Sequence, residues 1–293
     1  MTQERAARLR QMVQERTLAV PGVPNALAAR LAQRMGYPAV YVSGAALSAG
    51  VLAMPDVGLI TLTELAQQTA YISRAVSVPV LVDADTGFGG PLQVERAVVE
   101  LESAGAAAIQ IEDQPSQKRC GHLSGKQVIP IEQMVAKIRA AAAARHSPHT
   151  VIVARTDARG ACGLEEAVRR AEHYVRAGAD WIFPEALESE EEFVQFAEAI
   201  DVPLVANMTE FGKSPLLDMQ RLADIGYAVI LYPVTLLRIA VKAMESALRV
   251  LAAEQSQRSL LPHMQTRAEL YELLDYRDYD ERDRRYFGEG GNR

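Results

Sequence analysis

The sequence has only two cysteines, Cys120 and Cys162, among 293 residues, which excludes the disulfide framework of a small secreted protein. It also lacks excess basic charge: the formal net charge is −6, which argues against a protein that binds the phosphate backbone of nucleic acids. No apolar run approaches the roughly 20 residues that span a bilayer, and the opening residues MTQERAARLRQMVQERT contain no apolar signal core. We therefore expect a cytoplasmic protein that binds neither nucleic acid nor membrane.

Hydrophobic residues make up 49% of the sequence and charged residues 23%, which is enough apolar material for one large core, so we expect a single domain over residues 1–293. Short β-rich runs alternate with longer helical patterns, an order that favours βαβ units and a parallel sheet. Several runs are apolar through the middle and polar at the C-terminal end, which is typical of strands buried on both faces. The runs span residues 18–25, 38–44, 78–87, 107–114, 150–157, 180–186, 202–209 and 227–233.

Four of these runs follow a glycine that can end the preceding helix, in RMGYPAV, SAGAAAI, RAGADWI and DIGYAVI. Eight strand–helix repeats predict an α/β protein with a TIM-type (β/α)8 barrel over about residues 18–254 and extra helices at both ends. A doubly wound open sheet is the alternative, although no strand is followed by a dinucleotide-binding or Walker-type glycine loop. We expect a C-terminal helical extension at about 255–276 that contacts other subunits, and a charged tail at 277–293 whose last residues are disordered.

Polar residues gather at the C-terminal ends of the predicted strands, where the active site of a TIM barrel lies. Most are acidic, and carboxylates that converge on one mouth repel each other unless a cation is present. Oxygen ligands of this kind suit Mg²⁺ or Mn²⁺. Arginines, with Lys118 and His122, can bind an anionic substrate. The polar residues at the strand ends are Ser43, Gly44, Asp56, Asp83, Asp85, Glu112, Asp113, Arg155, Asp157, Glu185, Asn207, Thr209 and Arg238.

The segment SQKRCGHLSGKQVIP places Cys120 among cationic residues that include Lys118 and His122. Cationic neighbours lower the pKa of a thiol and increase its reactivity; a small buried structural cysteine is the alternative. Structural alternatives stay open elsewhere too. The residues DADTGFGG can form an Asx turn and a flexible glycine loop, Arg155 and Glu185 can simply pair across the barrel, and His122 can cap its loop.

The motifs YVSG, MPDVG, LVDADTGFG, IEDQ, KRCGH, ARTDA, FPEA, NMTEFG, LYP and MQTRAELYE occur in this order along nearly the whole chain. Together they resemble the isocitrate lyase and phosphoenolpyruvate mutase superfamily, and within it the methylisocitrate lyases; KRCGH with DADTGFG is the most specific pair. The resemblance implies an α/β barrel, a divalent cation and a homotetramer whose terminal helices exchange between subunits. The chain departs from the family pattern at Ala45-Ala46, where relatives often carry glycines that contact a substrate carboxylate through the backbone.

The resemblance also implies roles in cleaving a carbon–carbon bond beside a hydroxyl group, a reaction that needs a base, an electron sink and an acid. Mg²⁺, or alternatively Mn²⁺, would bind the 2-hydroxy acid and lower the pKa of its hydroxyl. The implied metal ligands, mostly through water, are Asp83, Asp85, Asp56 and Glu112. The implied catalytic residues are Cys120 as the acid, His122 and Glu185 assisting it, Arg155 facing the developing charge, and Tyr41 as the hydroxyl base.

By the same resemblance, the substrates are tri- and dicarboxylates, and a small apolar pocket distinguishes 2-methylisocitrate from isocitrate. Phe183 and Leu231 match the pocket residues of methylisocitrate lyases, with ordinary strand packing as the alternative. We therefore expect cleavage of 2-methylisocitrate to pyruvate and succinate, a step of the methylcitrate cycle in propionate catabolism. The other implied substrate contacts are Ser43, Gly44, Ala45, Lys118, Gly121, Arg155, Glu185, Asn207, Thr209 and Arg238.

Other functions remain open at this point. An isocitrate lyase, an oxaloacetate hydrolase or a phosphonate mutase would share the metal carboxylates, although KRCGH favours the lyases and the chain lacks the large insertion of isocitrate lyases proper. A Schiff-base aldolase needs a lysine on a barrel strand, and the lysines here are expected on loops or helices. A non-catalytic dicarboxylate sensor on the same barrel is the non-enzyme alternative.

Overall fold

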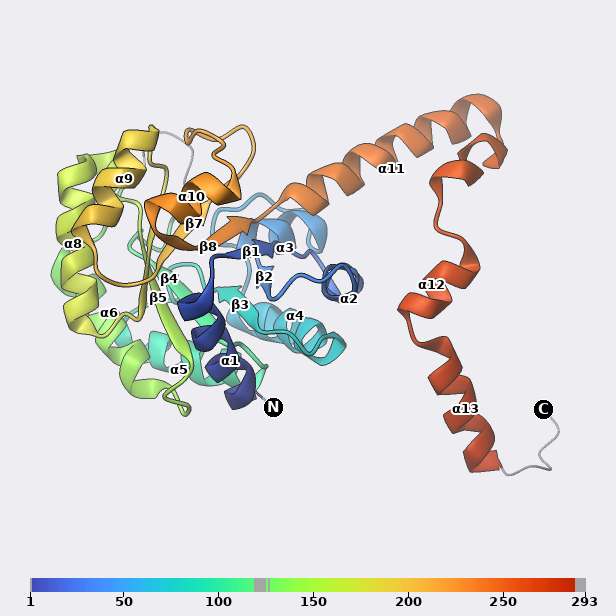
Figure 1. Ribbon diagram of the computed structural model, residues 1–293, viewed down its shortest axis with the longest axis horizontal. Helices are drawn as coiled ribbons and strands as arrows, with labels where there is room; N and C mark the ends of the chain where they lie inside the picture. The colour runs from blue at the N-terminus through green and yellow to red at the C-terminus, as the bar shows by residue number, and fades with distance from the viewer. Residues whose placement is uncertain (1, 119–124, 126, 288–293) are drawn as a thin grey trace. The chain divides into compact units, whose positions relative to one another are not determined.

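The computed structural model describes residues 2–118, 125 and 127–287, and the chain divides into two compact units, Met1–Leu237 and Arg238–Arg293. In the first unit, eight parallel strands form one sheet in the order β1-β8-β7-β6-β5-β4-β3-β2 (Figure 1). A parallel bridge between Gly22 and Tyr41 joins the two edges, so the sheet forms a nearly closed barrel. This confirms the predicted TIM-type fold and excludes the open sheet. The strands are β1 Leu18–Pro21, β2 Val40–Val42, β3 Val80–Asp83, β4 Ala108–Glu112, β5 Val151–Thr156, β6 Trp181–Pro184, β7 Leu204–Asn207 and β8 Tyr227–Tyr232.

Helices connect successive strands and cover the outside of the barrel (Figure 1). All four predicted glycine caps are confirmed, because Gly36, Gly105, Gly178 and Gly226 follow their helices in the left-handed conformation, with φ of +87°, +104°, +108° and +112°. The helices of the first unit are α1 Thr2–Glu15, α2 Ala26–Arg34, α3 Gly44–Gly50, α4 Leu62–Ala75, α5 Pro91–Ser103, α6 Ile131–Ala144, α7 Ala158–Cys162, α8 Leu164–Ala177, α9 Glu190–Ala199 and α10 Met219–Ile225.

Side chains along each strand alternate between the barrel interior and the surrounding helices, because successive residues of a strand point to opposite faces. Outward residues such as Ile109, Ile152 and Ile230 join the core beneath the helices. Inward residues form a second core, to which α1 contributes Leu9 and Met12 at the N-terminal end. The interior is therefore packed rather than hollow, and only the C-terminal ends of the strands, here called the barrel mouth, can hold a substrate. The inward strand residues of this core are Leu18, Val20, Tyr41, Leu81, Ala108, Val151, Val153, Trp181, Phe183, Val205, Val229 and Leu231.

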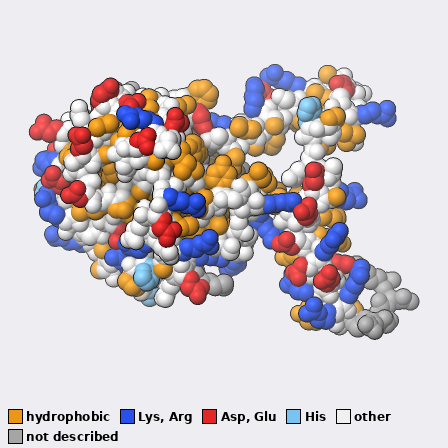
Figure 2. Space-filling view, in the orientation of Figure 1, with side chains coloured by type: hydrophobic (Ala, Val, Ile, Leu, Met, Phe, Trp, Pro, Cys, Tyr) orange, Lys and Arg blue, Asp and Glu red, His pale blue; other side chains and the backbone are white. Residues whose placement is uncertain are grey.

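The second unit consists of helices and carries many exposed apolar side chains (Figure 2). Helix α11 (Thr235–Glu254), which begins at the end of the first unit, buries none of its residues. The charged segment after residue 276 is helical: α13 (Tyr276–Phe287) is reinforced by ion pairs one turn apart, such as Arg284–Asp280 at 2.7 Å. The expected disorder of the last residues falls on 288–293, outside the described residues. The other elements are η1 Arg258–His263 and α12 Arg267–Leu273.

Across residues 2–118, 125 and 127–287, none of the helices combines the length and apolar character needed to cross a membrane.

Candidate active site

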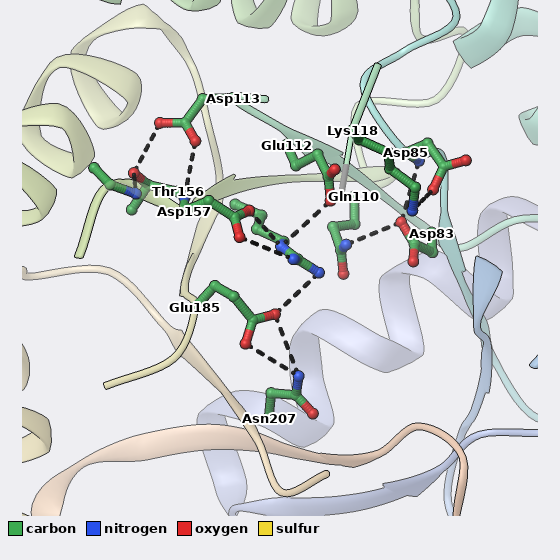
Figure 3. A network of polar contacts seen from close by, with 12 residues as sticks. Asp83, Asp85, Gln110, Glu112, Asp113, Lys118, Thr156, Asp157, Glu185 and Asn207 are labelled. Atoms are coloured by element: carbon green, nitrogen blue, oxygen red, sulfur yellow. Dashed lines mark hydrogen bonds and ion pairs between the residues drawn. The ribbon is translucent and has the colours of Figure 1, made fainter. Parts of the chain in front are cut away.

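The barrel mouth is lined by polar residues that continue the inward-facing pattern of the strands. On β3, β4, β5 and β7, and directly after β6, a polar residue lies two positions after an inward residue, so its side chain faces the same interior. Arg155 thus follows Val153, and Glu185 follows Phe183. The result is a polar layer directly above the apolar core (Figure 3). The other members of this layer on strands are Asp83, Gln110, Glu112 and Asn207.

Arg155 lies at the centre of one half of the mouth. Its Nη1 lies 3.0 Å from Glu185, and its Nε donates to Asp157 at 2.9 Å and lies 3.4 Å from Glu112. Burial alone would lower the pKa of Arg155, but Asp157, Glu185 and Glu112 raise it well above its usual value. Asn207 Nδ2 donates to Glu185 at 3.3 Å. A positively charged guanidinium is therefore held among three carboxylates. Figure 3 shows Glu112, Asp157 and Glu185 gathered around it.

The other half of the mouth is built from Asp83, Asp85, Asp56 and the buried side chain of Lys118. The Lys118 ammonium contacts Asp85 and lies 2.7 Å from Asp56. Burial alone would lower the pKa of Lys118, but the surrounding carboxylates raise it well above its ordinary value. Asp85 adopts a left-handed conformation with φ of +49°, and its N–H donates to Asp83 Oδ1 at 3.1 Å. The strained turn thus places two carboxylates side by side, beside one ammonium group.

Gly44 packs against the same two carboxylates. Its N–H donates to Asp83 Oδ2 at 3.3 Å, and a Cβ at this position would lie 3.1 Å from Asp85 Oδ1. A side chain at this position would therefore crowd both carboxylates. Ser43, the preceding residue, caps helix α3 by accepting a hydrogen bond from Ala46 N–H at 3.3 Å, and Ala45 follows in the first turn.

The donor set of the mouth fits a hard divalent cation. Glu112 is fully buried, and neither of its carboxylate oxygens has a hydrogen-bond partner among the described residues. Burial raises the pKa of Glu112 well above its usual value, although Arg155 and Lys118 lower it. Within the described part of the chain, no three Asp, Glu, His or Cys side chains already stand close enough to hold a metal ion. Carboxylate oxygens are the ligand type that Mg²⁺ and Mn²⁺ take, usually with several water ligands retained.

Gln110 is a residue of the mouth that the sequence analysis missed. Its Oε1 accepts a hydrogen bond from the Tyr41 hydroxyl at 2.8 Å, and its Nε2 donates to Asp83 Oδ1 at 3.0 Å. Burial raises the pKa of Tyr41 well above its usual value, and the hydroxyl proton is engaged by Gln110. Tyr41, Gln110 and Asp83 thus form one buried hydrogen-bonded network, and the role of Tyr41 as the hydroxyl base stays a prediction. Gln110 lies two residues before Glu112 on the same strand, so both side chains face inward. This spacing could have identified Gln110 from the sequence.

Phe183 and Leu231 lie in the apolar layer just below the mouth. Each side chain is 1% exposed, and the Arg155 guanidinium carbon lies 5.3 Å from the centre of the Phe183 ring. Leu231 pairs with Asn207 in the register of β7 and β8. Both side chains thus lie directly beneath polar groups of the mouth, where they can form an apolar pocket floor.

The remaining predicted residues differ in where the structure places them. Thr209 is buried just after β7. Arg238 is the first residue of the second unit. Asp113 faces away from the mouth, because it follows the inward-facing Glu112 by one residue; its carboxylate contacts helix α8 instead. Cys120, Gly121 and His122 lie outside the described residues.

Sequence and structure comparisons identify similar proteins along nearly the whole chain. The family model described as phosphoenolpyruvate phosphomutase matches residues 9–252. A 2-methylisocitrate lyase of Aeropyrum pernix is 55% identical over 276 residues, which cover 94% of this chain and 89% of that protein. A 2-methylisocitrate lyase of Bacillus subtilis is 48% identical, covering 91% of this chain and 88% of that protein.

Solved structures of several activities share the fold. A 2,3-dimethylmalate lyase, described as a member of the PEP mutase/isocitrate lyase superfamily, has a TM-score of 0.89 and 34% identity, with 98% of each chain covered. A phosphonopyruvate hydrolase in complex with oxalate and Mg²⁺ has a TM-score of 0.86 and 30% identity, with 99% of each chain covered.

Proposed function

The chain belongs to the phosphoenolpyruvate phosphomutase family, and from this premise we propose that it is a Mg²⁺-dependent carbon–carbon lyase that cleaves 2-methylisocitrate to pyruvate and succinate. The observation that carries the proposal is its high identity, over nearly the full length, to several 2-methylisocitrate lyases. The charged mouth above an apolar layer supports it, because the substrate is a tricarboxylate with one methyl group. The reaction would belong to the methylcitrate cycle of propionate catabolism, in the cytoplasm.

We propose that Mg²⁺ is held through Asp85, with Asp83, Asp56 and Glu112 around it mostly through water; Mn²⁺ is the alternative ion. When bound, the ion would chelate the 2-hydroxy acid portion of the substrate and lower the pKa of its hydroxyl. Neither carboxylate oxygen of Glu112 accepts a hydrogen bond from the described residues, and this supports a cation beside its 3.4 Å ion pair with Arg155. So does the family relationship to a phosphonopyruvate hydrolase that was solved with oxalate and Mg²⁺.

Arg155 would bind the carboxylate end of the substrate that becomes succinate. As the carbon–carbon bond breaks, its electron pair moves onto the succinate fragment, and the Arg155 guanidinium and the Asn207 amide can stabilise the resulting negative charge. Glu185 holds both groups, at 3.0 Å and 3.3 Å. The family resemblance assigns to Cys120 the proton that completes succinate, with His122 assisting.

Lysine chemistry is disfavoured as the alternative. A Schiff-base aldolase needs a neutral lysine on a strand, and no strand of the described residues carries a lysine. Lys118 approaches the mouth from a loop, and its raised pKa keeps it protonated and non-nucleophilic.

We also propose a homotetramer in which the C-terminal helices exchange between subunits. The support is that α11 buries none of its residues, although Ile239, Met244 and Leu248 are each more than half exposed, at 65%, 54% and 65%. An apolar helix of this kind is stabilised by covering it with protein. Size-exclusion chromatography with light scattering should give the tetramer mass for the full chain, and a smaller species for a Met244→Glu, Leu248→Glu variant.

The decisive experiment is a keto-acid release assay on 2-methylisocitrate, isocitrate and oxaloacetate, with Mg²⁺ and with excess chelator. We expect pyruvate from 2-methylisocitrate in the presence of Mg²⁺ only. Faster glyoxylate release from isocitrate would make the protein an isocitrate lyase. Binding of succinate without turnover of any of the three substrates would support a dicarboxylate sensor.

A further inference from the structure

A buried charged cluster lies on the outer side of the barrel wall, behind the mouth. It consists of Asp113, at the end of β4, and Arg170 and Tyr174, on the face of α8 that packs against the barrel. Tyr174 Oη donates to Asp113 Oδ2 at 2.7 Å, and Arg170 Nη1 lies 3.3 Å from the same oxygen. Asp113 and Tyr174 are fully buried, and Arg170 is 6% exposed. A buried charge destabilises the fold unless it is paired in good geometry and its remaining polar atoms are hydrogen-bonded.

The same carboxylate reaches the strand that carries Arg155. Asp113 Oδ1 accepts a hydrogen bond from the backbone N–H of Asp157 at 2.8 Å, and Oδ2 accepts one from the Thr156 hydroxyl at 2.8 Å. The backbone N–H of Asp113 donates to the Arg155 carbonyl at 3.2 Å. Asp113 therefore fixes the chain on both sides of Thr156, which separates Arg155 from Asp157.

Asp157 transmits this constraint to the mouth. Its carboxylate accepts hydrogen bonds from Arg155 Nε at 2.9 Å and from Nη2 at 3.1 Å, a paired geometry that sets the plane of the guanidinium. With these two nitrogens held, Nη1 is left directed toward Glu185, at 3.0 Å. A continuous set of contacts thus runs from helix α8 through Asp113 and Asp157 to the guanidinium. Figure 3 shows the part of it from Asp113 to Asp157.

We propose that Asp113, Arg170 and Tyr174 are positioning residues: they hold the backbone of Asp157 so that its carboxylate orients Arg155 toward the anionic part of the substrate. The proposal rests on the proposed function, in which Arg155 binds the succinate half. A cluster that only attached α8 to the barrel would not need two hydrogen bonds to the residues next to Arg155. Removing such a purely structural cluster would change the free energy of unfolding without changing the orientation of the Arg155 guanidinium.

Two neighbouring arginines on α8 provide a matched test. Arg169 and Arg170 both pair with Glu166, at 2.7 Å and 2.9 Å, but only Arg170 also reaches Asp113. Arg170→Met should weaken succinate binding and lower kcat about 3- to 30-fold, the range typical of residues coupled to a site through contacts. Arg169→Met should change neither. Tyr174→Phe keeps the ring in the core and should give a smaller loss of succinate binding and kcat. This variant provides the test if Arg170→Met does not fold.

Two further measurements separate positioning from simple stabilisation. In an Asp157→Asn background, Arg170→Met should add little, because the link to Arg155 is already lost; fully additive losses would contradict the pathway. Hydrogen exchange of the Asp157 amide should be faster in Arg170→Met and Tyr174→Phe than in Arg169→Met, and this readout needs no substrate.

The outcomes distinguish the two proposals. If the wild type does not cleave 2-methylisocitrate, yet Arg170→Met still accelerates Asp157 exchange and weakens succinate binding, the positioning role stands and the proposed substrate is wrong. If turnover is as proposed, but Arg170→Met and Tyr174→Phe match Arg169→Met in both exchange and binding, the positioning role is wrong.

Discussion

The ammonium nitrogen of Lys118 lies 2.7 Å from a carboxylate oxygen of Asp56 and also contacts Asp85, while 4% of the lysine side chain is exposed. These carboxylates belong to the proposed metal site. A protonated lysine therefore supplies positive charge to the site independently of any metal ion. The Lys118 ammonium and a bound metal ion would each offset the negative charge of these carboxylates. Their two contributions can be tested separately.

Lys118→Met should destabilise the metal-free protein. The change leaves Asp85 and Asp56 without their ammonium partner, and removing one partner of a buried pair costs about 3–5 kcal/mol. Urea unfolding in excess chelator measures this loss, and added Mg²⁺ should recover more stability in the variant than in the wild type. Arg96→Met is the control, because Arg96 pairs with Glu100 at 3.9 Å on the surface of α5 with 73% of its side chain exposed. An equal effect of the two changes would contradict the compensating role.

Asp85→Ala should abolish Mg²⁺-dependent turnover, because it removes the carboxylate through which we propose the ion is held. Calorimetric titration with Mg²⁺ should show the loss of binding directly, without reference to activity. Glu100→Ala removes a carboxylate from the exposed surface of α5 and should leave both measurements unchanged. Turnover that persists in excess chelator would contradict the metal scheme.

Mg²⁺ affinity should fall as pH is lowered through about 6. Burial raises the pKa of Asp85 to about 6, although Lys118 pulls it down, and a protonated carboxyl cannot bind the ion. The stability of the metal-free protein should change with pH in the opposite direction. Because the pKa of Asp85 is raised on folding, the folded protein binds this proton more tightly than the unfolded chain. The contribution of Asp85 to the free energy of unfolding therefore rises as pH falls from above 6 toward 4. Titrations with Mg²⁺ between pH 5 and 8, paired with metal-free unfolding curves, check both slopes. Affinity that is constant from pH 7 to pH 5 would contradict the assignment.

Cys120→Ser should lower turnover by roughly 10²-fold, the effect typical of a lost general acid, because a serine hydroxyl is a far poorer acid than a thiol. Succinate binding should be retained. The exposed Cys162 provides the control, since Cys162→Ser should leave turnover unchanged. A Cys120→Ser variant with full activity would remove this residue from the chemistry.

Leu231→Phe should lower kcat/KM for 2-methylisocitrate more than for isocitrate, because a larger side chain occupies the space for the substrate methyl group. In the wild type, one methyl group in an apolar pocket corresponds to a preference of about 10- to 200-fold. Leu18→Phe enlarges the same inner core on β1, far below the mouth, and controls for overpacking, which costs about 1–3 kcal/mol. Selectivity that shifts equally in both variants would remove Leu231 from the pocket.

The barrel could be predicted from the sequence because burial on both faces leaves a readable pattern. Each observed strand lies inside a predicted run; β5, for example, spans Val151–Thr156 within residues 150–157. The same pattern located the acidic strand ends. The charged segment after residue 276 was interpreted as a tail, although its Asp and Arg residues are spaced one helical turn apart, and the structure places them on α13.

The details of the site were harder to predict from the sequence, because they depend on side-chain orientation and on contacts between residues distant in the chain. Glu112 and Asp113 are adjacent and equally acidic, but strand alternation sends one into the mouth and the other toward α8. Gln110 carries no charge and was overlooked, although it shares the inward face with Glu112. The pairing of Lys118 with Asp56 joins two loops far apart in the chain, and no local pattern predicts it.

The two faces of each strand have different roles: inward residues near the mouth lie beneath the proposed substrate site, and outward residues pack against the helices. Phe183 and Leu231 face the interior beneath the mouth, whereas their neighbours Ile182 and Ile230 hold the helices. During evolution, one inward side chain can be exchanged without disturbing the packing between strand and helix, so a new substrate preference can arise by point mutation on an unchanged scaffold. The backbone of this chain is shared with a 2,3-dimethylmalate lyase and a phosphonopyruvate hydrolase, at TM-scores of 0.89 and 0.86.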